Sequence, residues 1–217
     1  MVAVGHESAY RRSRRRLIET LRNGGITDLA VLYAFDAVPR HVFVPEAVRH
    51  RAYEDVALPL GHGQTISRPG VHALHLQLAE LGGTERVLEI GTGSGFQTAL
   101  LAHLVGHVYS IEVVPEIAAF GEAALERLGV DNVTLRVGDG SRGWAEEAPF
   151  DRILVGAAAP HPPETLVAQL AEGGKMLVPV GDDTGQELTL VSREADGLET
   201  TVIDRARFVP LVGEEGW

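Results

Sequence analysis

Between residues 70 and 180 the sequence alternates short apolar runs with stretches of helical periodicity, and this alternation limits the fold more than any other feature. The apolar runs lie at 86–90, 107–111, 133–137, 152–155 and 175–180, and the helical stretches at 70–81, 95–104, 115–128 and 163–171. Pro163 suits the first turn of the last of these helices, and Gly173 and Gly174 follow its expected end. Strands that alternate with helices form βαβ units, so the sequence predicts a doubly wound α/β fold with a mostly parallel, Rossmann-like sheet.

The N-terminal segment predicts two short helices followed by irregular backbone. The helices are expected at 13–22 and 27–36, because the run NGG at 23–25 stops the first and Thr27 can cap the second. Four prolines then punctuate a stretch up to residue 69 that has little periodicity, and we expect it to be irregular but packed.

The C-terminal segment lacks a convincing helix. Two strand-like stretches flank the run READG at 193–197, which predicts an antiparallel hairpin at the end of the sheet. We expect one domain over 1–217, made of N-terminal helices and an active-site loop (1–69), a cofactor-binding core (70–180) and C-terminal strands (181–217).

Composition and charge exclude several functions. Acidic residues outnumber Lys and Arg by 30 to 19, giving a net charge of −11, which argues against a nucleic-acid partner. The one basic cluster, Arg11 to Arg16, is interpreted as the solvated face of an N-terminal helix. The absence of cysteine excludes disulfides and thiolate chemistry, and no histidine pair has the spacing of a metal site. Without a signal-peptide pattern or a membrane-length apolar run, we expect a cytoplasmic monomer that binds no membrane.

The glycine-rich run "VLEIGTGSGFQ" at 87–97 stands where the first core strand turns into its helix. Ligands of open α/β sheets bind at this end of the strands. Gly91, Gly93 and Gly95 let the backbone approach a ligand, and the next helix offers free N–H groups. A glycine-rich turn alone is weak evidence for any particular cofactor.

Two carboxylates narrow the choice of ligand. Glu112 closes the next strand, 21 residues after Gly91, where it can accept both hydroxyls of a ribose. Asp139 lies in a GDG run after the third strand, where it can face the amine of an adenine; taken alone it is equally well explained as a turn residue.

A nicotinamide dinucleotide and S-adenosylmethionine compete for this loop. The glycines fall as GxGxG behind Glu89, whereas a pyrophosphate favours GxGxxG. An acid beside a pyrophosphate would be repelled, but the same acid near the ammonium of an amino-acid cofactor is attracted. The loop therefore favours S-adenosylmethionine, with S-adenosyl-L-homocysteine as the product.

A second glycine-flanked run, "GHGQTISRPG" at 61–70, lies just upstream of this loop. It offers Gln64, Thr65 and Ser67, which can orient an anion without neutralising it, and only His62 as a base. A carboxylate acceptor is already ionised at neutral pH and needs no base. The alternative is a solvent loop whose polar groups cap the helix near Gly70.

The run "AYEDVALPLGHGQTISRPGVHA", followed by "VLEIGTGSGFQTALLA", "LAEGGKMLVPVG" and "RFVPLVG", resembles the protein-L-isoaspartate O-methyltransferase family over about Val38 to Gly213. The resemblance implies methyl transfer from S-adenosylmethionine to the α-carboxylate of L-isoaspartyl residues in damaged proteins and peptides. The ester would then close to a succinimide, whose hydrolysis restores some aspartate.

The resemblance also implies roles for individual residues. It assigns Ser67 to the active site and the following residues to the cofactor: Thr65, Ile66, Ser67, His72, Glu89, Gly91, Gly93, Glu112, Asp139 and Gly140. Gln64, Ser67 and Val209 are expected to border the substrate. We interpret Ser67 as a hydrogen-bond donor that orients the acceptor carboxylate, because its hydroxyl has no His/Asp relay in the sequence. The alternatives are a carboxyl or small-molecule O-methyltransferase of this fold, or a nicotinamide-dependent oxidoreductase.

Overall fold

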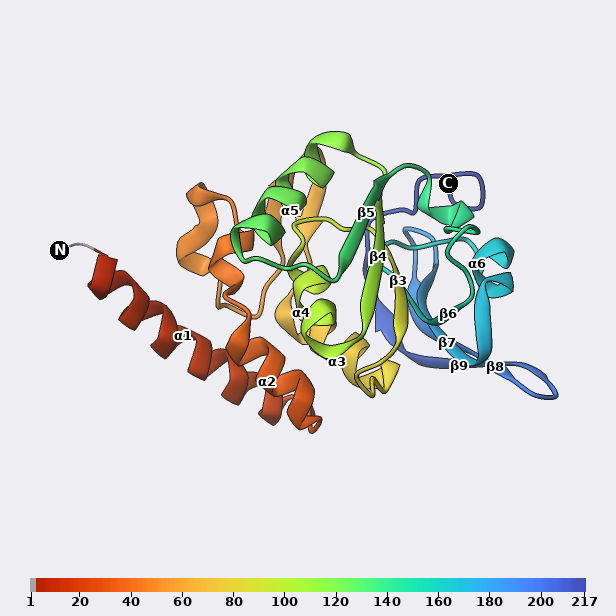
Figure 1. The fold of residues 1–217 in the computed structure, drawn as a ribbon, viewed down its shortest axis with the longest axis horizontal. Coiled ribbons are helices and arrows are strands. Elements are labelled where there is room, and N and C mark those ends of the chain that lie inside the picture. The colour runs from red at the N-terminus through yellow and green to blue at the C-terminus, as the bar shows by residue number, and fades with distance from the viewer. Residues whose placement is uncertain (1–2) are drawn as a thin grey trace.

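A computed structural model describes residues 3–217, and its centre is a sheet of seven strands in the order β5-β4-β3-β6-β7-β8-β9 (Figure 1). The strands are β3 (Arg86–Ile90), β4 (His107–Glu112), β5 (Val133–Val137), β6 (Phe150–Val155), β7 (Leu170–Gly181), β8 (Gln186–Glu194) and β9 (Gly197–Ala206). Strands β3 to β7 pair in parallel, β8 pairs antiparallel with β7, and β9 pairs antiparallel with β8. The predicted fold class and the terminal hairpin are both confirmed.

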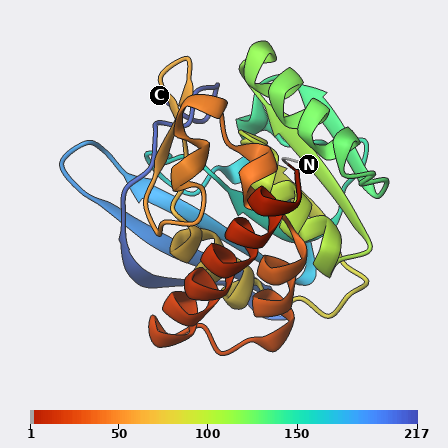
Figure 2. The same ribbon diagram turned by 90° about the vertical axis from the view of Figure 1, so that its left-hand side faces the viewer.

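Helices cover the two faces of the sheet unequally. They are α1 (Ala3–Asn23), α2 (Leu29–Ala37), α3 (Pro69–Ala79), α4 (Phe96–Leu104), α5 (Pro115–Arg127) and α6 (Glu164–Ala168), with 3₁₀ turns η1 (Arg40–Phe43), η2 (Glu46–Arg51) and η3 (Gly140–Arg142). Helices α3, α4 and α5 lie on one side of the sheet and α6 on the other (Figure 1), while α1 and α2 lie outside α3 and α4 (Figure 2).

Alternation along the strands sends side chains into two separate cores. In β3, Val87 joins the core under α2, α3 and α4, and Leu88 joins the core on the α6 face. Both side chains are fully buried, and burial of a leucine side chain contributes about 1.5–3 kcal/mol. Glu89, next in the strand, therefore points back toward the helical face that Val87 occupies.

The N-terminal helices differ in detail from the expectation. Helix α1 is longer than the predicted 13–22, and α2 is capped by Asp28, not by Thr27 as predicted. The Oδ1 atom of Asp28 accepts hydrogen bonds from the backbone of Ala30 and Val31, at 2.8 and 3.2 Å. The backbone N–H of Thr27 instead donates to Gln77 on α3 at 2.7 Å, so tertiary contact decides which residue caps the helix.

The helix predicted over 163–171 is present but ends earlier than expected. Helix α6 ends at Ala168, and the chain enters β7 at Leu170, which pairs with Phe150 of β6 and is buried. Gly173 has a φ of +72° and lies where the pairing of β6 with β7 is irregular, so it serves a bulge and not a helix end.

The stretch before α3 is more regular than expected. Strands β1 (Leu58–Gly61) and β2 (Gln64–Ile66) form a two-stranded hairpin. Its two-residue turn consists of His62 and Gly63 with φ of 51° and 74°, as a type I′ turn requires. Ile66 is buried in a small core with Val44, Ala52 and Leu58, which holds the hairpin on the molecule.

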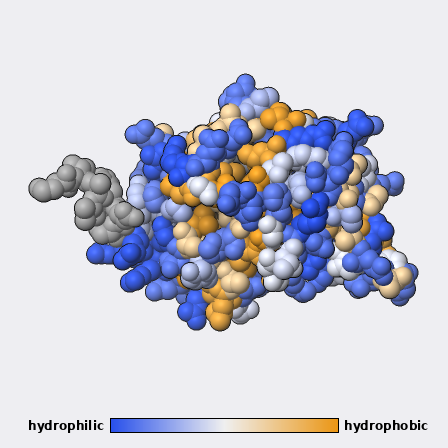
Figure 3. All heavy atoms as spheres, viewed as in Figure 1, coloured by the Kyte–Doolittle hydropathy of each residue, from blue (hydrophilic) through white to orange (hydrophobic). Residues whose placement is uncertain are grey.

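The surface is mainly polar, with apolar residues showing in the middle of the face in Figure 3. Helix α1 is the longest helix, at 21 residues, and it carries the arginines of the 11–16 cluster. Of these, Arg11, Arg12, Arg15 and Arg16 are exposed, as expected for a solvated helix face. Within residues 3–217, no helix is both long enough and apolar enough to cross a membrane.

The identity of the cap residue can be tested directly. Asp28→Ala should lower the free energy of unfolding by about 1 kcal/mol, because two N–H groups of the first turn of α2 lose their acceptor. Thr27→Ala is the matched control and should cost only a few tenths of a kcal/mol, since its hydroxyl lies 3.4 Å from Gln77. The shift in the urea unfolding midpoint at unchanged slope measures both values. A larger loss for Thr27→Ala would contradict the assignment.

Candidate active site

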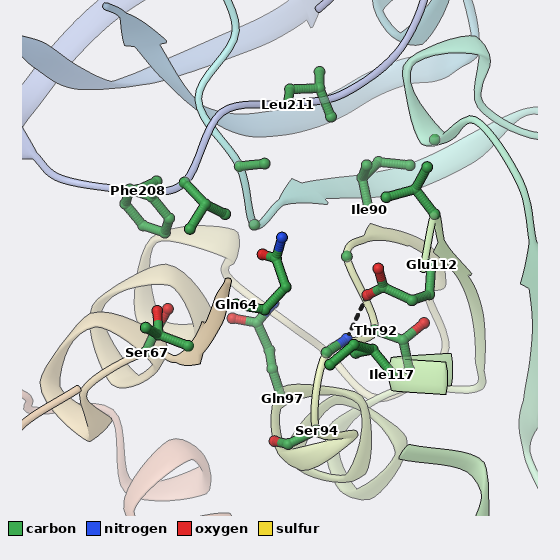
Figure 4. Close-up of a pocket in the computed structure, with 18 of the residues that line it drawn as sticks. Gln64, Ser67, Ile90, Thr92, Ser94, Gln97, Glu112, Ile117, Phe208 and Leu211 are labelled. Carbon is green, nitrogen blue, oxygen red and sulfur yellow. Dashed lines mark hydrogen bonds between the residues drawn. The ribbon is translucent and has the colours of Figure 1, made fainter. Parts of the chain in front are cut away.

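A cleft opens at the carboxyl ends of β3, β4 and β6, the position predicted for a ligand (Figure 4). Three segments form most of its walls: the turn after β3, the segment from β2 into α3, and the C-terminal segment 208–212. The structure brings these predicted residues into the lining: Gln64, Thr65, Ile66, Ser67, His72, Gly91, Gly93, Glu112, Gly140 and Val209. Glu89 and Asp139 are not part of that lining.

The glycine-rich turn is compact because a helix backbone lies against it. Gly95 has a φ of +83°, and a Cβ placed on it would lie 3.0 Å from the carbonyl oxygen of Gly121 in α5. A Cβ on Gly121 would in turn lie 2.9 Å from the carbonyl oxygen of Gly93. Two backbones thus meet here with no side chain between them, and the turn keeps its N–H groups open toward the cleft.

Glu112 ends β4 and faces the cleft from the side opposite Ser67 (Figure 4). Its Oε2 atom accepts a hydrogen bond from the N–H of Gly93 at 2.8 Å, drawn as a dashed line, and its Oε1 atom accepts one from Val114 at 3.1 Å. Each oxygen keeps a further lone pair, so the carboxylate can still accept the hydroxyls of a ribose.

Glu89 lies behind the cleft wall, between the sheet and α4, and is fully buried. It accepts hydrogen bonds from Thr98 at 2.5 Å and Ser110 at 2.7 Å on Oε2, and from Gln97 at 3.0 Å on Oε1. Burial raises the pKa of Glu89 to about 7, although these three hydrogen bonds act to lower it. Of its three partners, Gln97 also lines the cleft.

Asp139 caps η3 and is engaged by two parts of the chain. Its Oδ1 atom accepts from the N–H and hydroxyl of Ser141, and its Oδ2 atom accepts from the N–H of Glu214 at 2.9 Å. The next residue, Gly140, does reach the cleft, and a Cβ there would lie 2.5 Å from Ile90. The turn therefore presents backbone to the ligand site, while the Asp139 side chain holds the C-terminal segment.

The segment that carries Ser67 is held by a buried arginine. Arg40 of η1 donates from Nη2 to the carbonyl oxygen of Ser67 at 2.9 Å, and its guanidinium stacks over Phe96 at 4.6 Å. The hydroxyl of Ser67 has no partner in the described part of the chain, so it is free to bind a ligand. His62 is exposed at the hairpin turn and does not line the cleft.

Two buried histidines of α3 also line the cleft, and the sequence pointed to only one of them as a site residue. Burial and the nearby Arg40 lower the pKa of His72 to about 3, and burial lowers the pKa of His75 to about 4. Both rings are therefore neutral at physiological pH. His75 stacks on Phe208 at 5.5 Å, a contact across 133 positions that no local pattern could have indicated.

The C-terminal wall of the cleft is fixed to the loop after β6. Ala158 donates its N–H to Val209, and Leu211 donates its N–H to Ala158, both at 2.8 Å. Phe208 and Leu211 border the cleft above Gln64 and Glu112 in Figure 4.

Among residues 3–217, no group of three or more His, Asp or Glu side chains is placed to hold a metal ion.

Comparisons with known proteins agree on one family. The family model of Protein-L-isoaspartate(D-aspartate) O-methyltransferase (PCMT) matches residues 12–216. A protein-L-isoaspartate O-methyltransferase of Anaeromyxobacter sp. is 56% identical over 195 residues, covering 88% of this chain and 92% of that protein. One of Syntrophobacter fumaroxidans is 49% identical over 209 residues, covering 96% and 98%. A Plasmodium falciparum member, solved in complex with S-adenosyl-L-homocysteine, superposes with a TM-score of 0.81 at 29% identity, covering 92% and 98%.

The raised pKa of Glu89 predicts how stability depends on pH. Because the folded pKa of about 7 exceeds the ordinary value of 4.5, the folded state holds the proton more tightly. The contribution of Glu89 to stability is therefore complete below pH 4.5 and is lost as the pH rises to 7, by on the order of 3 kcal/mol. Urea unfolding at pH 5, 6, 7 and 8 should show this loss relative to Glu89→Gln.

His72 and His75 have lowered pKa values, so their contribution to stability is lost as the pH falls, in the wild type and in Glu89→Gln alike. The difference between the two proteins therefore isolates the contribution of Glu89. Glu199→Gln, an exposed substitution on β9, should parallel the wild type at every pH. A flat difference curve for Glu89→Gln would show that Glu89 does not titrate in this range.

Proposed function

Because the chain belongs to the protein-L-isoaspartate(D-aspartate) O-methyltransferase family, we propose that its cleft transfers a methyl group from S-adenosylmethionine to the α-carboxylate of L-isoaspartyl residues. The chain is an enzyme that methylates isoaspartyl residues with S-adenosylmethionine. The observation that carries the proposed role of this cleft is that both the glycine-rich turn and the 64–67 segment line it.

The residues of the cleft fit the cofactor. The glycine turn leaves backbone space beside the end of β3, and Glu112 offers free acceptor positions for a ribose. His72 lines the cleft and its Nε2 atom is buried without a partner in the described chain. When bound, S-adenosylmethionine supplies an electrophilic methyl group on a positively charged sulfur. Asp139 and Glu89 would support this site indirectly, through backbone and side chains that reach the cleft.

The side chains opposite Glu112 suit an acceptor that is already an anion. Gln64, Thr65 and Ser67 are neutral, and the low pKa values leave His72 and His75 uncharged. A carboxylate with a pKa near 4 needs orientation and exclusion of water, not removal of a proton. The lining therefore supports transfer to a carboxylate more than transfer to an amine or alcohol, which would call for a base.

Ser67 would orient that carboxylate by donating a hydrogen bond. The bond from Arg40 to its carbonyl fixes its backbone, and its hydroxyl is uncommitted. Ile66 anchors β2 in the small core beside it, so the segment is held in place from two directions. Thr65, on the same strand, would lie along the methyl end of the cofactor.

A groove next to the cleft would receive the peptide on either side of the isoaspartyl residue. It shares Ser67, His75, Phe208 and Val209 with the cleft and continues along the end of β9. A protein substrate needs such an extended surface, whereas a small molecule would need only the cleft. This continuity favours a peptide or protein acceptor.

The proposed reaction is tested with a pair of peptides that differ only in the linkage of one aspartyl residue. With S-adenosylmethionine, the isoaspartyl peptide should be methylated, and the aspartyl peptide should be methylated more slowly by orders of magnitude. Thermal shifts should increase with S-adenosylhomocysteine and not with NADH. Equal rates on both peptides would overturn the substrate assignment, and stabilisation by NADH alone would overturn the cofactor.

Ser67→Ala should lower kcat about 10- to 100-fold, as expected when one hydrogen bond to a charged group is lost. The Kd for S-adenosylhomocysteine, measured by calorimetry, should change less than about threefold, because the hydroxyl orients the acceptor and not the cofactor. Ser192→Ala, in β8 and outside the cleft, is the control and should keep the parent kcat. An unchanged kcat in Ser67→Ala would remove Ser67 from this role.

The monomeric state, the cytoplasmic location, the lack of a nucleic-acid partner and the single-domain organisation stay predictions. The net charge of −11 supports the expectation about nucleic acids. Light scattering on the purified protein would decide the oligomeric state.

A further inference from the structure

We propose that Gln97 is a positioning residue that ties the glycine-rich turn to the segment carrying Ser67, by holding the proton of His72 on its Nδ1 atom. Gln97 lies in the first turn of α4, directly after the glycine-rich turn, and His72 lies in α3, five positions after Ser67. The effect of Gln97 on the reaction rests on the proposed function, but the position of the proton does not.

The buried carboxylate sets the direction of every hydrogen bond around it. At pH 8, above its pKa of about 7, Glu89 is ionised and can only accept. Ser110 donates its one hydroxyl proton to Glu89, so Thr92, 2.7 Å away, must be the donor to Ser110. The oxygen of Thr92 is then left as an acceptor in the cleft wall.

The same argument fixes the amide of Gln97. Its Nε2 group must donate to Glu89, at 3.0 Å, so its Oε1 atom faces Nδ1 of His72 at 2.8 Å. An amide oxygen can only accept, and the neutral ring must therefore carry its proton on Nδ1. Both side chains are buried, so water cannot easily replace either contact.

At the other end of the ring, this arrangement suits the buried arginine. With the proton on Nδ1, Nε2 of His72 has a lone pair and no proton. Arg40 is close enough for its charge to lower the pKa of His72, and a lone pair interacts better with a cation than an N–H group does. The backbone carbonyl of Ser67 also faces the ring and acts in the opposite direction, raising the pKa of His72. Arg40 in turn holds the carbonyl of Ser67.

The wild-type protein tests the central claim without any substitution. Two-bond ¹H–¹⁵N correlation spectra at pH 8 on ¹⁵N-labelled protein, without substrate, distinguish the two ring nitrogens of each histidine. The signals of His72 are assigned by their loss in His72→Gln. We expect Nδ1 to be protonated and Nε2 to be bare; a proton on Nε2 would overturn the proposal whatever the enzyme methylates.

Two substitutions at one position then separate positioning from simple packing. Gln97→Met removes the acceptor, and the proton should move to Nε2, the form that free neutral imidazole side chains favour. Gln97→Glu keeps an oxygen facing Nδ1 of His72, and its other oxygen, when protonated, can still donate to Glu89, so the ring proton should stay on Nδ1. A proton that stays on Nδ1 in Gln97→Met would overturn the proposal, and if that variant does not fold, the wild-type spectrum decides.

The kinetic consequence follows the spectra. Gln97→Met should lower kcat on the isoaspartyl peptide about 5- to 10-fold, while the Kd for S-adenosylhomocysteine changes less than about threefold. A lower kcat without a change of tautomer would assign Gln97 a purely structural role. A changed tautomer with unchanged kcat would disprove the connection to Ser67.

Discussion

The burial of one carboxylate between the sheet and α4 constrains the whole cofactor side of this molecule. A charged group without water must be surrounded by donors, and Glu89 obtains them from two elements, α4 and β4. The first turn of α4 must therefore stay in register with the ends of β3 and β4. Only a few residues connect the end of β3 to the start of α4. The chain makes this short connection with a left-handed backbone at Gly91, Gly93 and Gly95.

Most of the fold could be predicted because it rests on local periodicity. The five parallel strands and helices α3, α4 and α5 alternate along the chain, and short βαβ connections leave few topologies. The errors occur where distant partners decide. Asp28 and Thr27 are both good cap residues, and only Gln77 from another helix determines which one caps α2. Leu170 reads as helical, but its pairing with Phe150 makes it a strand residue.

The site was predictable to the extent that its residues follow strands. Glu112 ends β4, the strand next to β3 and its glycine turn. Because parallel strands end at the same edge of a sheet, the position of Glu112 in the cleft follows from the order of the strands along the chain. Arg40, His75 and Phe208 come from other segments and were missed, because no spacing connects them to the turn. Glu89 was expected at the cofactor; alternation in β3 turns it inward, where its hydrogen bonds go to Gln97, Thr98 and Ser110.

The backbone contact between α5 and the glycine-rich turn has a mechanical consequence. Side chains between two elements act as a soft layer that absorbs small displacements, and at Gly95 and Gly121 that layer is missing. A displacement of α5 is therefore passed to the turn by direct contact between the two backbones. The outer face of this helix is therefore a lever on the glycine-rich turn.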